Sequence, residues 1–188
     1  MAELERQKRV MSMMITAHSV LRDKYLSLSS IFENILLIAS VILNALVFID
    51  AQFILKTINI SEESQRLITG IASIIVFAIS VVLLQVKWKE KAEGHANASN
   101  KLFSLLQECK SVLSLPENDE KNLKVLDFHK KYSDIFETLV KIPDNKFNSL
   151  KLKHNRKVEL SKLIDKYPGS LLWILKIRLF LNSFKEKK

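Results

Sequence analysis

The chain has 188 residues, of which 48% are hydrophobic, and a formal net charge of +9. A single cysteine, Cys109, excludes an internal disulfide and a cysteine-rich metal site. With three glycines, three prolines and no stretch that has the two-residue alternation of a half-buried strand, the composition argues against a β-scaffold and predicts an all-α protein.

The first predicted element is a helix over residues 1–30. Mostly apolar residues recur there every three or four positions, which predicts one buried stripe along the helix. No run of seven apolar residues occurs before Ile35, so this end does not resemble a secretory signal, and we expect the following apolar segment to be retained. The stripe comprises Met11, Met14, His18, Leu21, Tyr25 and Leu28.

Two apolar segments of bilayer length follow, at residues 31–49 and 67–86. In the second, no residue is charged and thirteen of the twenty are Leu, Ile, Val or Phe. It is long enough to cross the ~30 Å hydrocarbon layer, and its side chains favour insertion by about 4 to 8 kcal/mol. The alternative is a buried helix of a soluble bundle. Because the connection at residues 50–66 is too short for a domain, we predict a transmembrane hairpin with a short external loop.

Basic residues around the hairpin predict its orientation. Arg22 and Lys24 precede the first segment, and three lysines within residues 87–91 follow the second, whereas the connection offers only Lys56 and Arg66. Cytoplasmic flanks of membrane spans are enriched in lysine and arginine. Both termini are therefore predicted to be cytoplasmic.

The second segment continues outward with the same helical spacing, and an unbroken helix over residues 67–113 would be a rod about 70 Å long. Turns are predicted at residues 114–120 and 142–145, and a further helix extends to about Tyr167. Together these elements form a predicted cytoplasmic helical bundle over residues 87–167. Its two apolar stripes are Ala92, His95, Ser99, Leu102, Leu106, Cys109 and Leu113, then Val125, Phe128, Tyr132, Ile135, Leu139 and Ile142.

The last element, residues 168–188, is a basic amphipathic helix. Its apolar part, SLLWILKIRLFLNSF at 170–184, is too short to span a bilayer and contains Lys176 and Arg178. A helix in the membrane interface, with Trp173 at the head-group level, fits this pattern. Packing against the bundle or a neighbouring subunit fits it equally well.

Positive charge is concentrated near the carboxyl end. Residues 143–188 hold twelve lysines and arginines and four acidic residues, a surplus of eight. Two interpretations are open: a surface on anionic lipid or in plain solvent, and a site for nucleic acid or nucleotide phosphates. The densest part, named here the basic patch, comprises Lys151, Lys153, Arg156 and Lys157.

Polar residues inside the two apolar segments are candidates for a membrane function. In each segment their spacing at about 100° per residue places them on one helix face. Such residues hydrogen-bond between helices or line a water-filled path, and two helices alone enclose no pore, so a path requires a homo-oligomer. The candidates are Glu33, Ser40 and Asn44 in the first segment and Ser73 and Ser80 in the second.

No enzymatic motif is present. The four histidines are scattered, and no zinc-binding His-Glu-x-x-His pair, glycine-rich phosphate loop or nucleophile elbow occurs, so we expect neither enzymatic activity nor a cofactor. His18 and His95 both lie on predicted buried stripes, and antiparallel packing would bring them close. Ordinary core histidines and a pH or ligand sensor are the two interpretations of this pair.

The order of AHSVLRDKY at 17–25, a two-span hairpin, and VKWKEKAEGHANASNKLFSLLQE at 86–108 resembles the SLATT family, the SMODS- and SLOG-associating two-transmembrane effectors of bacterial conflict systems. The layout is most similar to the subgroup encoded beside defence reverse transcriptases. The positions that carry the resemblance are Arg22, Tyr25, Trp88, Lys91, His95 and Ala98.

The resemblance implies an effector of an anti-phage, abortive-infection system in the bacterial inner membrane. Such effectors oligomerise when a sensor partner signals infection, permeabilise the membrane and stop growth. The implied partners are a reverse transcriptase or a nucleotide-generating or nucleotide-sensing enzyme, with the basic patch as candidate receiver. The alternatives are a membrane-tethered scaffold and a nucleic-acid- or nucleotide-responsive adaptor, both without pore activity.

Overall fold

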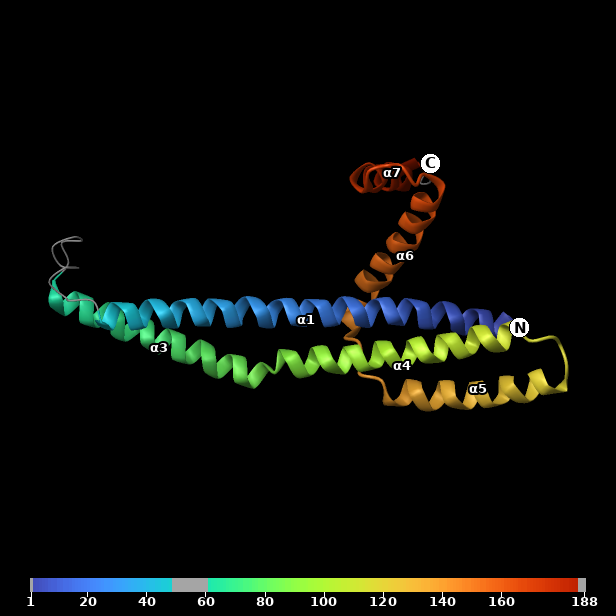
Figure 1. Cartoon of the computed structure of the whole chain (residues 1–188), viewed down its shortest axis with the longest axis horizontal. Coiled ribbons are helices and arrows are strands. Elements are labelled where there is room, and N and C mark those ends of the chain that lie inside the picture. Colours follow the sequence, from blue (N-terminus) through green and yellow to red (C-terminus); the bar gives the residue numbers. More distant parts are fainter. Residues whose placement is uncertain (1, 49–60, 186–188) are drawn as a thin grey trace. The chain divides into compact units, whose positions relative to one another are not determined.

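The structure, a computed structural model, describes residues 2–48 and 61–185. Within these ranges the regular elements are all α-helices, which confirms the predicted fold class. The chain divides into two compact units: unit 1 comprises Met1–Val20 and His95–Lys188, and unit 2 comprises Leu21–Gly94. Residue 49, the last of the first predicted span, residues 50–60 of the predicted external loop, and the last three residues lie outside the described residues. The helices are α1 (Ala2–Phe48), α3 (Glu62–Val86), α4 (Trp88–Ser114), α5 (Asp119–Thr138), α6 (Asp144–Lys166) and α7 (Leu172–Lys185) (Figure 1).

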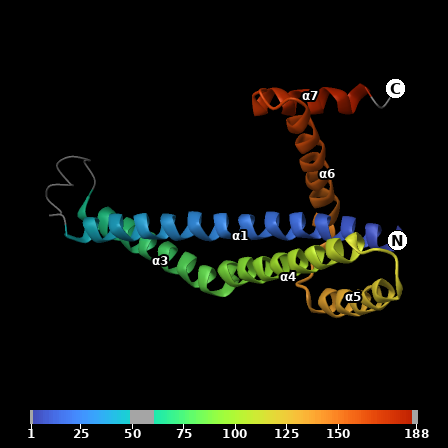
Figure 2. The same cartoon turned by 45° about the vertical axis from the view of Figure 1, so that its right-hand side comes forward.

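Unit 1 is built around a core shared by α1, α4 and α5, which lie side by side in Figures 1 and 2. Phe128 of α5 is completely buried there, and the α4 side of the core consists largely of the predicted stripe. The helical spacing therefore identified the buried faces of both helices. The buried core residues are Leu4, Met11, Leu102, Leu105, Leu106, Cys109, Val112 and Phe128.

Local signals set the ends of α5. Its first turn is capped by Asn118, whose side-chain oxygen accepts a hydrogen bond from the Lys121 backbone nitrogen at 2.9 Å. The helix ends at Thr138, before the last two members of the predicted stripe, Leu139 and Ile142. Ile142 stands directly before Pro143, a position where helical backbone is disfavoured, and α6 begins immediately after that proline.

The carboxyl-terminal part of unit 1 is a helix pair in which α7 lies across the end of α6 (Figure 2). The connection contains Pro168 and Gly169, as expected for a helix stop. Leu175 of α7 is buried, and the Arg178 guanidinium lies over the Tyr167 ring at 4.5 Å from its centroid. The cation–π contact therefore links α7 to Tyr167, the residue that caps the carboxyl end of α6.

Unit 2 contains the carboxyl-terminal half of α1, all of α3 and the first turns of α4. Ser61 caps α3 by accepting a hydrogen bond from the Ser64 backbone nitrogen at 3.3 Å. Because of this cap α3 begins at Glu62, so residues 62–66 of the predicted external loop are helical.

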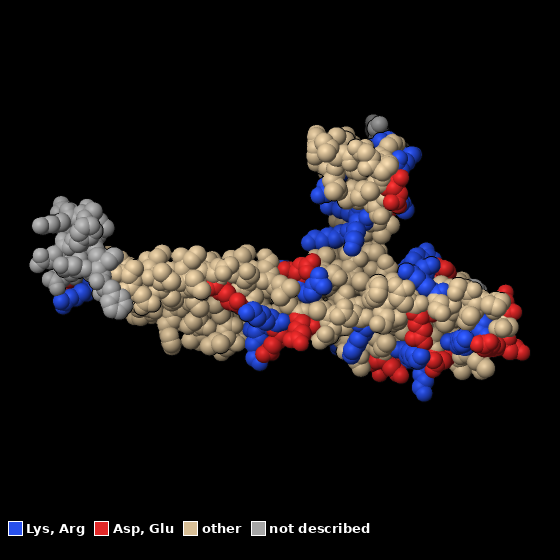
Figure 3. Space-filling model, viewed as in Figure 1, with Lys and Arg blue, Asp and Glu red and all other residues tan. Residues whose placement is uncertain are grey.

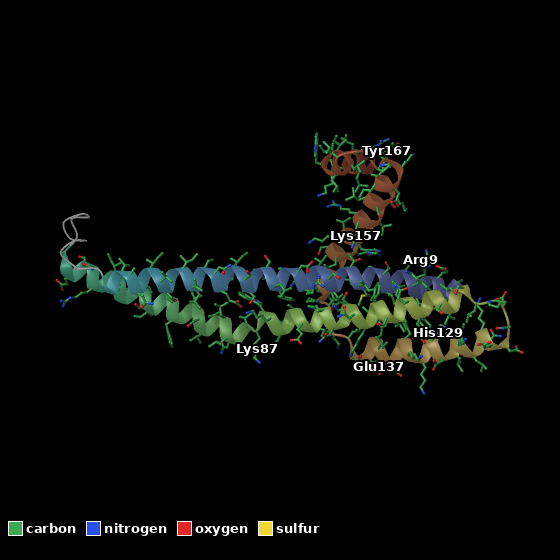
Figure 4. The ribbon with its side chains drawn as sticks, in the orientation of Figure 1. Arg9, Lys87, His129, Glu137, Lys157 and Tyr167 are labelled. Atoms are coloured by element: carbon green, nitrogen blue, oxygen red, sulfur yellow. The ribbon has the colours of Figure 1, made fainter. Side chains whose placement is uncertain are left out.

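Residues 67–113 do not form one unbroken rod, because the helix is interrupted at Lys87. That residue has left-handed backbone, with φ 51° and ψ 48°, and it separates α3 from α4. A left-handed residue other than glycine costs about 1 to 2 kcal/mol, so nearby contacts must compensate for it. Figure 4 shows Lys87 at this junction.

Candidate functional site

Unit 2 presents two apolar helical surfaces of bilayer length. In α1 and in α3, an 18-residue window has mean hydropathy of 2.0 and 2.8, respectively. Only 6% of the first window and none of the second is buried inside the protein. Phe77 and Leu84 are 69% and 77% exposed, and Figure 3 shows this part of unit 2 largely without charged side chains.

This exposure argues against the soluble-bundle alternative. A core helix of a soluble protein would bury its apolar side chains, since burial of a large aliphatic or aromatic side chain contributes about 1.5 to 3 kcal/mol. A contiguous apolar surface of this extent is typical of lipid contact. Both helices are therefore suited to cross a membrane.

The boundary of this apolar surface is marked by contacts between α1 and the start of α4 within unit 2. The Phe32 and Trp88 rings pack with their centroids 5.0 Å apart. Beside them, the Lys89 ammonium donates to Glu33 Oε2 at 2.9 Å. Aromatic and basic side chains are enriched where a helix leaves the bilayer, and these contacts occur directly after the break at Lys87. They link the first span to the segment that leaves the second.

The predicted polar candidates differ in how they are satisfied. Glu33 accepts hydrogen bonds from Ser29 at 2.6 Å and from Lys89. Ser40, Ser73 and Ser80 each donate to a backbone carbonyl of their own helix, at 2.7 to 2.9 Å. A serine bonded in this way needs no partner on another helix.

Asn44 is the exception among the candidates. Its side chain is exposed on α1, and its amide has no hydrogen-bond partner among the described residues. An amide has two donors and an acceptor, all of which are costly to leave unpaired in hydrocarbon. Of the five candidates, Asn44 has the strongest need for a partner outside the chain.

In unit 1, His18 of α1 and His95 of α4 face each other. Their Nδ1 atoms are 2.9 Å apart, and both side chains are buried. Antiparallel packing thus brings these two residues together, as the stripes indicated. One Nδ1 donates and the other accepts, so the two rings have different tautomers. The hydroxyls of Ser19, one residue after His18, and Ser99, four residues after His95, are 3.3 Å apart.

The surroundings of the pair disfavour protonation. Burial, followed by the charge of His95, lowers the pKa of His18 to about 4. Burial, followed by the charge of Lys146, lowers the pKa of His95. His18 Nε2 is buried and has no hydrogen-bond partner in the described part of the chain. Nδ1 protons on both rings would place two donors opposite each other at 2.9 Å, and the lowered pKa values favour the uncharged form of each ring.

A match over nearly the whole sequence identifies the family of the chain. The profile of the SMODS and SLOG-associating 2TM effector domain family 5 matches residues 5–182, which cover nearly all of both units. The chain belongs to this family. The resemblance to SLATT proteins is therefore confirmed, and the two transmembrane segments of the family name agree with the two apolar windows. No curated protein and no solved structure was found to match the chain.

The basic patch of this SLATT chain lies on α6. Lys151, Lys153, Arg156 and Lys157 are all exposed, and Figure 4 shows Lys157 on the side of that helix. Basic side chains recur along α6 in Figure 3. The structure therefore leaves the patch open to an anionic ligand or surface.

Sequence reasoning missed two further histidine contacts in the SLATT fold. His129 Nδ1 lies 3.1 Å from Gln7 Nε2, and His154 Nδ1 lies 2.9 Å from Thr16 Oγ1. With His18, three α1 residues thus each meet a histidine from a different helix. The sequence offered one indication of these contacts, the position of Gln7 three residues after Leu4. The structure shows that both residues are buried. A buried polar side chain in a stripe requires a partner.

Proposed function

We propose that this protein is a membrane effector whose hairpins associate and permeabilise the bacterial inner membrane during an anti-phage response. The observation that carries the proposal is the exposure of both bilayer-length windows, of which 6% and 0% is buried. Membership of a two-transmembrane effector family also supports the proposal. In this proposal the protein acts physically, by changing the barrier of the membrane, and catalyses no reaction.

The Asn44 amide, which has no hydrogen-bond partner among residues 2–48 and 61–185, supports association of several chains. Two helices enclose no pore, so any aqueous path needs further copies. Interhelical hydrogen bonds in membranes contribute about 1 kcal/mol each, and an asparagine facing a neighbouring hairpin gains such bonds. The exposed Asn44 therefore becomes the contact between copies, or the lining of the path they enclose.

The remaining candidates have weaker roles in this proposal. The side chains of Ser40, Ser73 and Ser80 are small, so neighbouring helices can approach closely at these positions. Each serine is already hydrogen-bonded within its own helix and needs no hydrogen bond from a neighbouring helix. Glu33 forms an ion pair with Lys89 at the cytoplasmic end of the first span. The basic flanks support the orientation with both termini in the cytoplasm.

A partner supplies the trigger in this proposal. The family name refers to SMODS and SLOG proteins, which makes a nucleotide-generating or nucleotide-sensing partner the expected one. A reverse transcriptase is the partner expected of the subgroup noted above. The exposed basic patch on α6 is suited to receive a nucleotide or nucleic acid, since its four cations are free to contact phosphates.

Dye release from liposomes tests the proposed activity. Purified protein is reconstituted into vesicles loaded with a self-quenched dye, and the rate of release is compared for the wild type, Asn44→Leu and Val41→Leu. We expect Asn44→Leu to slow release by at least about fivefold, the equivalent of one interhelical hydrogen bond. Val41→Leu enlarges an exposed apolar residue one turn away and is the matched control.

Equal release by wild type and Asn44→Leu, with equal amounts inserted, would contradict the role of Asn44. No release by any variant, with or without the partner, would contradict permeabilisation itself. Replacement of the hairpin by an unrelated one then distinguishes the tethered scaffold, because growth arrest in cells survives that replacement only if the hairpin is a mere anchor.

A further inference from the structure

One side of α7 is apolar and exposed among the residues that the structure describes. The helix packs against α6, and Leu175 is buried, whereas the side chains on the side of α7 opposite Leu175 are exposed. At about 100° per residue, these side chains fall within roughly 100° of arc, centred almost opposite Leu175. They are Trp173, Ile174, Ile177 and Leu181.

Basic residues border this apolar face on both sides. Lys176 follows one edge and Arg178 the other, each about 40 to 60° from the nearest apolar residue. Both side chains are exposed, and the Arg178 guanidinium is held over Tyr167 at 4.5 Å from the ring centroid. Lys166 lies near the same ring, with its ammonium 5.7 Å from the centroid. The apolar face therefore has a cationic border on each side.

We propose that α7 docks this face into the head-group region of a bilayer that contains anionic lipid. The ring of Trp173 lies among the head groups, and the apolar side chains enter the boundary of the acyl chains. Lys176 and Arg178 contact lipid phosphates from the two borders. Exposed basic residues of α6 add further positive charge to this helix pair.

Charge favours lipid over a second copy of the chain as the occupant. A two-fold interface would place the same surface of both copies together. Residues 143–188 have twelve basic and four acidic residues, a surplus of eight, so this interface would oppose like charges. An anionic membrane surface is complementary to the same charges. The two spans also hold the chain at a membrane, which raises the effective concentration of lipid around α7.

This docking is separate from the proposed activity of the hairpin. It requires a membrane-anchored chain and holds whether or not the hairpins form a path for solutes. A failed dye-release assay therefore leaves it standing, and its own failure leaves permeabilisation standing.

Quenching of Trp173 fluorescence by brominated lipid tests the proposal in the full chain. The chain has two tryptophans, so Trp88→Phe leaves Trp173 as the only reporter and keeps a ring against Phe32. The protein is reconstituted into vesicles of phosphatidylcholine alone, or with added phosphatidylglycerol, carrying bromine near the head-group end of the acyl chains. We expect blue-shifted, strongly quenched emission with phosphatidylglycerol, and loss of quenching at high salt.

Charge variants identify the contacts. Lys176→Gln with Arg178→Gln should weaken docking about tenfold or more, seen as a return toward unquenched emission. Lys176→Gln alone, which leaves the Tyr167 contact intact, should have a smaller effect in the same direction. The matched control, Lys101→Gln with Lys110→Gln, removes two exposed charges from α4 and should change nothing.

Three results would overturn the proposal. Unquenched emission typical of water-exposed indole in every vesicle would show that α7 does not dock. Blue-shifted but unquenched emission, together with crosslinking between copies through α7, would show that a second chain covers the face. Equal quenching with and without phosphatidylglycerol would show that anionic lipid is not what α7 recognises.

Discussion

The two units use apolar helices in opposite ways. In unit 1 the apolar stripes of α4 and α5 are buried or partly buried, and Phe128 has no exposed surface. In unit 2 the apolar residues of α1 and α3 are mostly exposed, as Ile74 and Phe77 illustrate. Apolar side chains of the same types are thus covered by protein in one unit and exposed in the other. Hydrophobic stabilisation in unit 1 comes from the chain itself, whereas unit 2 needs a lipid solvent.

The largest expected effect is loss of the unit 1 core. Phe128→Ala removes a fully buried ring and should lower the free energy of unfolding by about 3 to 5 kcal/mol. Phe77→Ala, at an exposed position of unit 2, creates no cavity inside the protein and should leave unit 1 unchanged. Urea unfolding in detergent micelles, followed by near-ultraviolet circular dichroism, measures both. An equal loss of unfolding free energy in the two variants would contradict the proposed difference between the units.

A charge on an exposed leucine or isoleucine should distinguish the two solvents. Ile74 in unit 2 is 68% exposed and Leu126 in unit 1 is 71% exposed. Ile74→Lys should disfavour membrane insertion by about 3 to 4 kcal/mol, because lysine is placed near the middle of a span. Leu126→Lys should change stability by less than about 0.5 kcal/mol, because that position faces water. The membrane-inserted fraction of each variant provides the measurement, and full insertion of Ile74→Lys would contradict the assignment.

Acid should weaken unit 1. His18 has a pKa of about 4 in the folded chain and about 6.5 when unfolded, so the unfolded state binds the proton first. Stability should therefore fall as pH drops from about 6.5 to about 4, by about 2 to 3 kcal/mol, and then level off. His18→Gln should remove most of this slope. Unfolding midpoints at pH 7, 5.5 and 4.5 test it, and an equally steep slope in His18→Gln would assign the effect to other groups.

The smallest expected effect concerns the ion pair between Glu33 and Lys89. Both side chains are largely exposed, at 46% and 69%, and exposed pairs contribute little. Lys89→Gln should leave the urea midpoint unchanged within error at physiological salt. Trp88→Ala, which removes the ring packed on Phe32, should lower it measurably. A larger effect for Lys89→Gln than for Trp88→Ala would reverse the relative importance of the two contacts.

Several elements could be predicted from the sequence because their causes are local. Apolar spacing identified the buried stripe of α4, and length with composition identified the two apolar windows. The stripe positions of His18 and His95 were enough to foresee their approach, since antiparallel helices pair such positions. Their depressed pKa values required the burial that only the packed unit defines.

Other features depend on tertiary contacts that leave little trace in the sequence. Lysine has no preference for left-handed backbone, so the break at Lys87 had no local signal, and the packing of Trp88 on Phe32 became visible only in the fold. The same holds for His129 and His154, whose partners lie more than one hundred positions away along the chain.

The account rests on lipid as the solvent of unit 2, and carbonate extraction of cell membranes tests this directly. We expect the expressed protein to remain in the membrane pellet at alkaline pH and to need detergent for release. Release without detergent, as a compact particle in which Ile74 and Phe77 are shielded from solvent, would contradict the account.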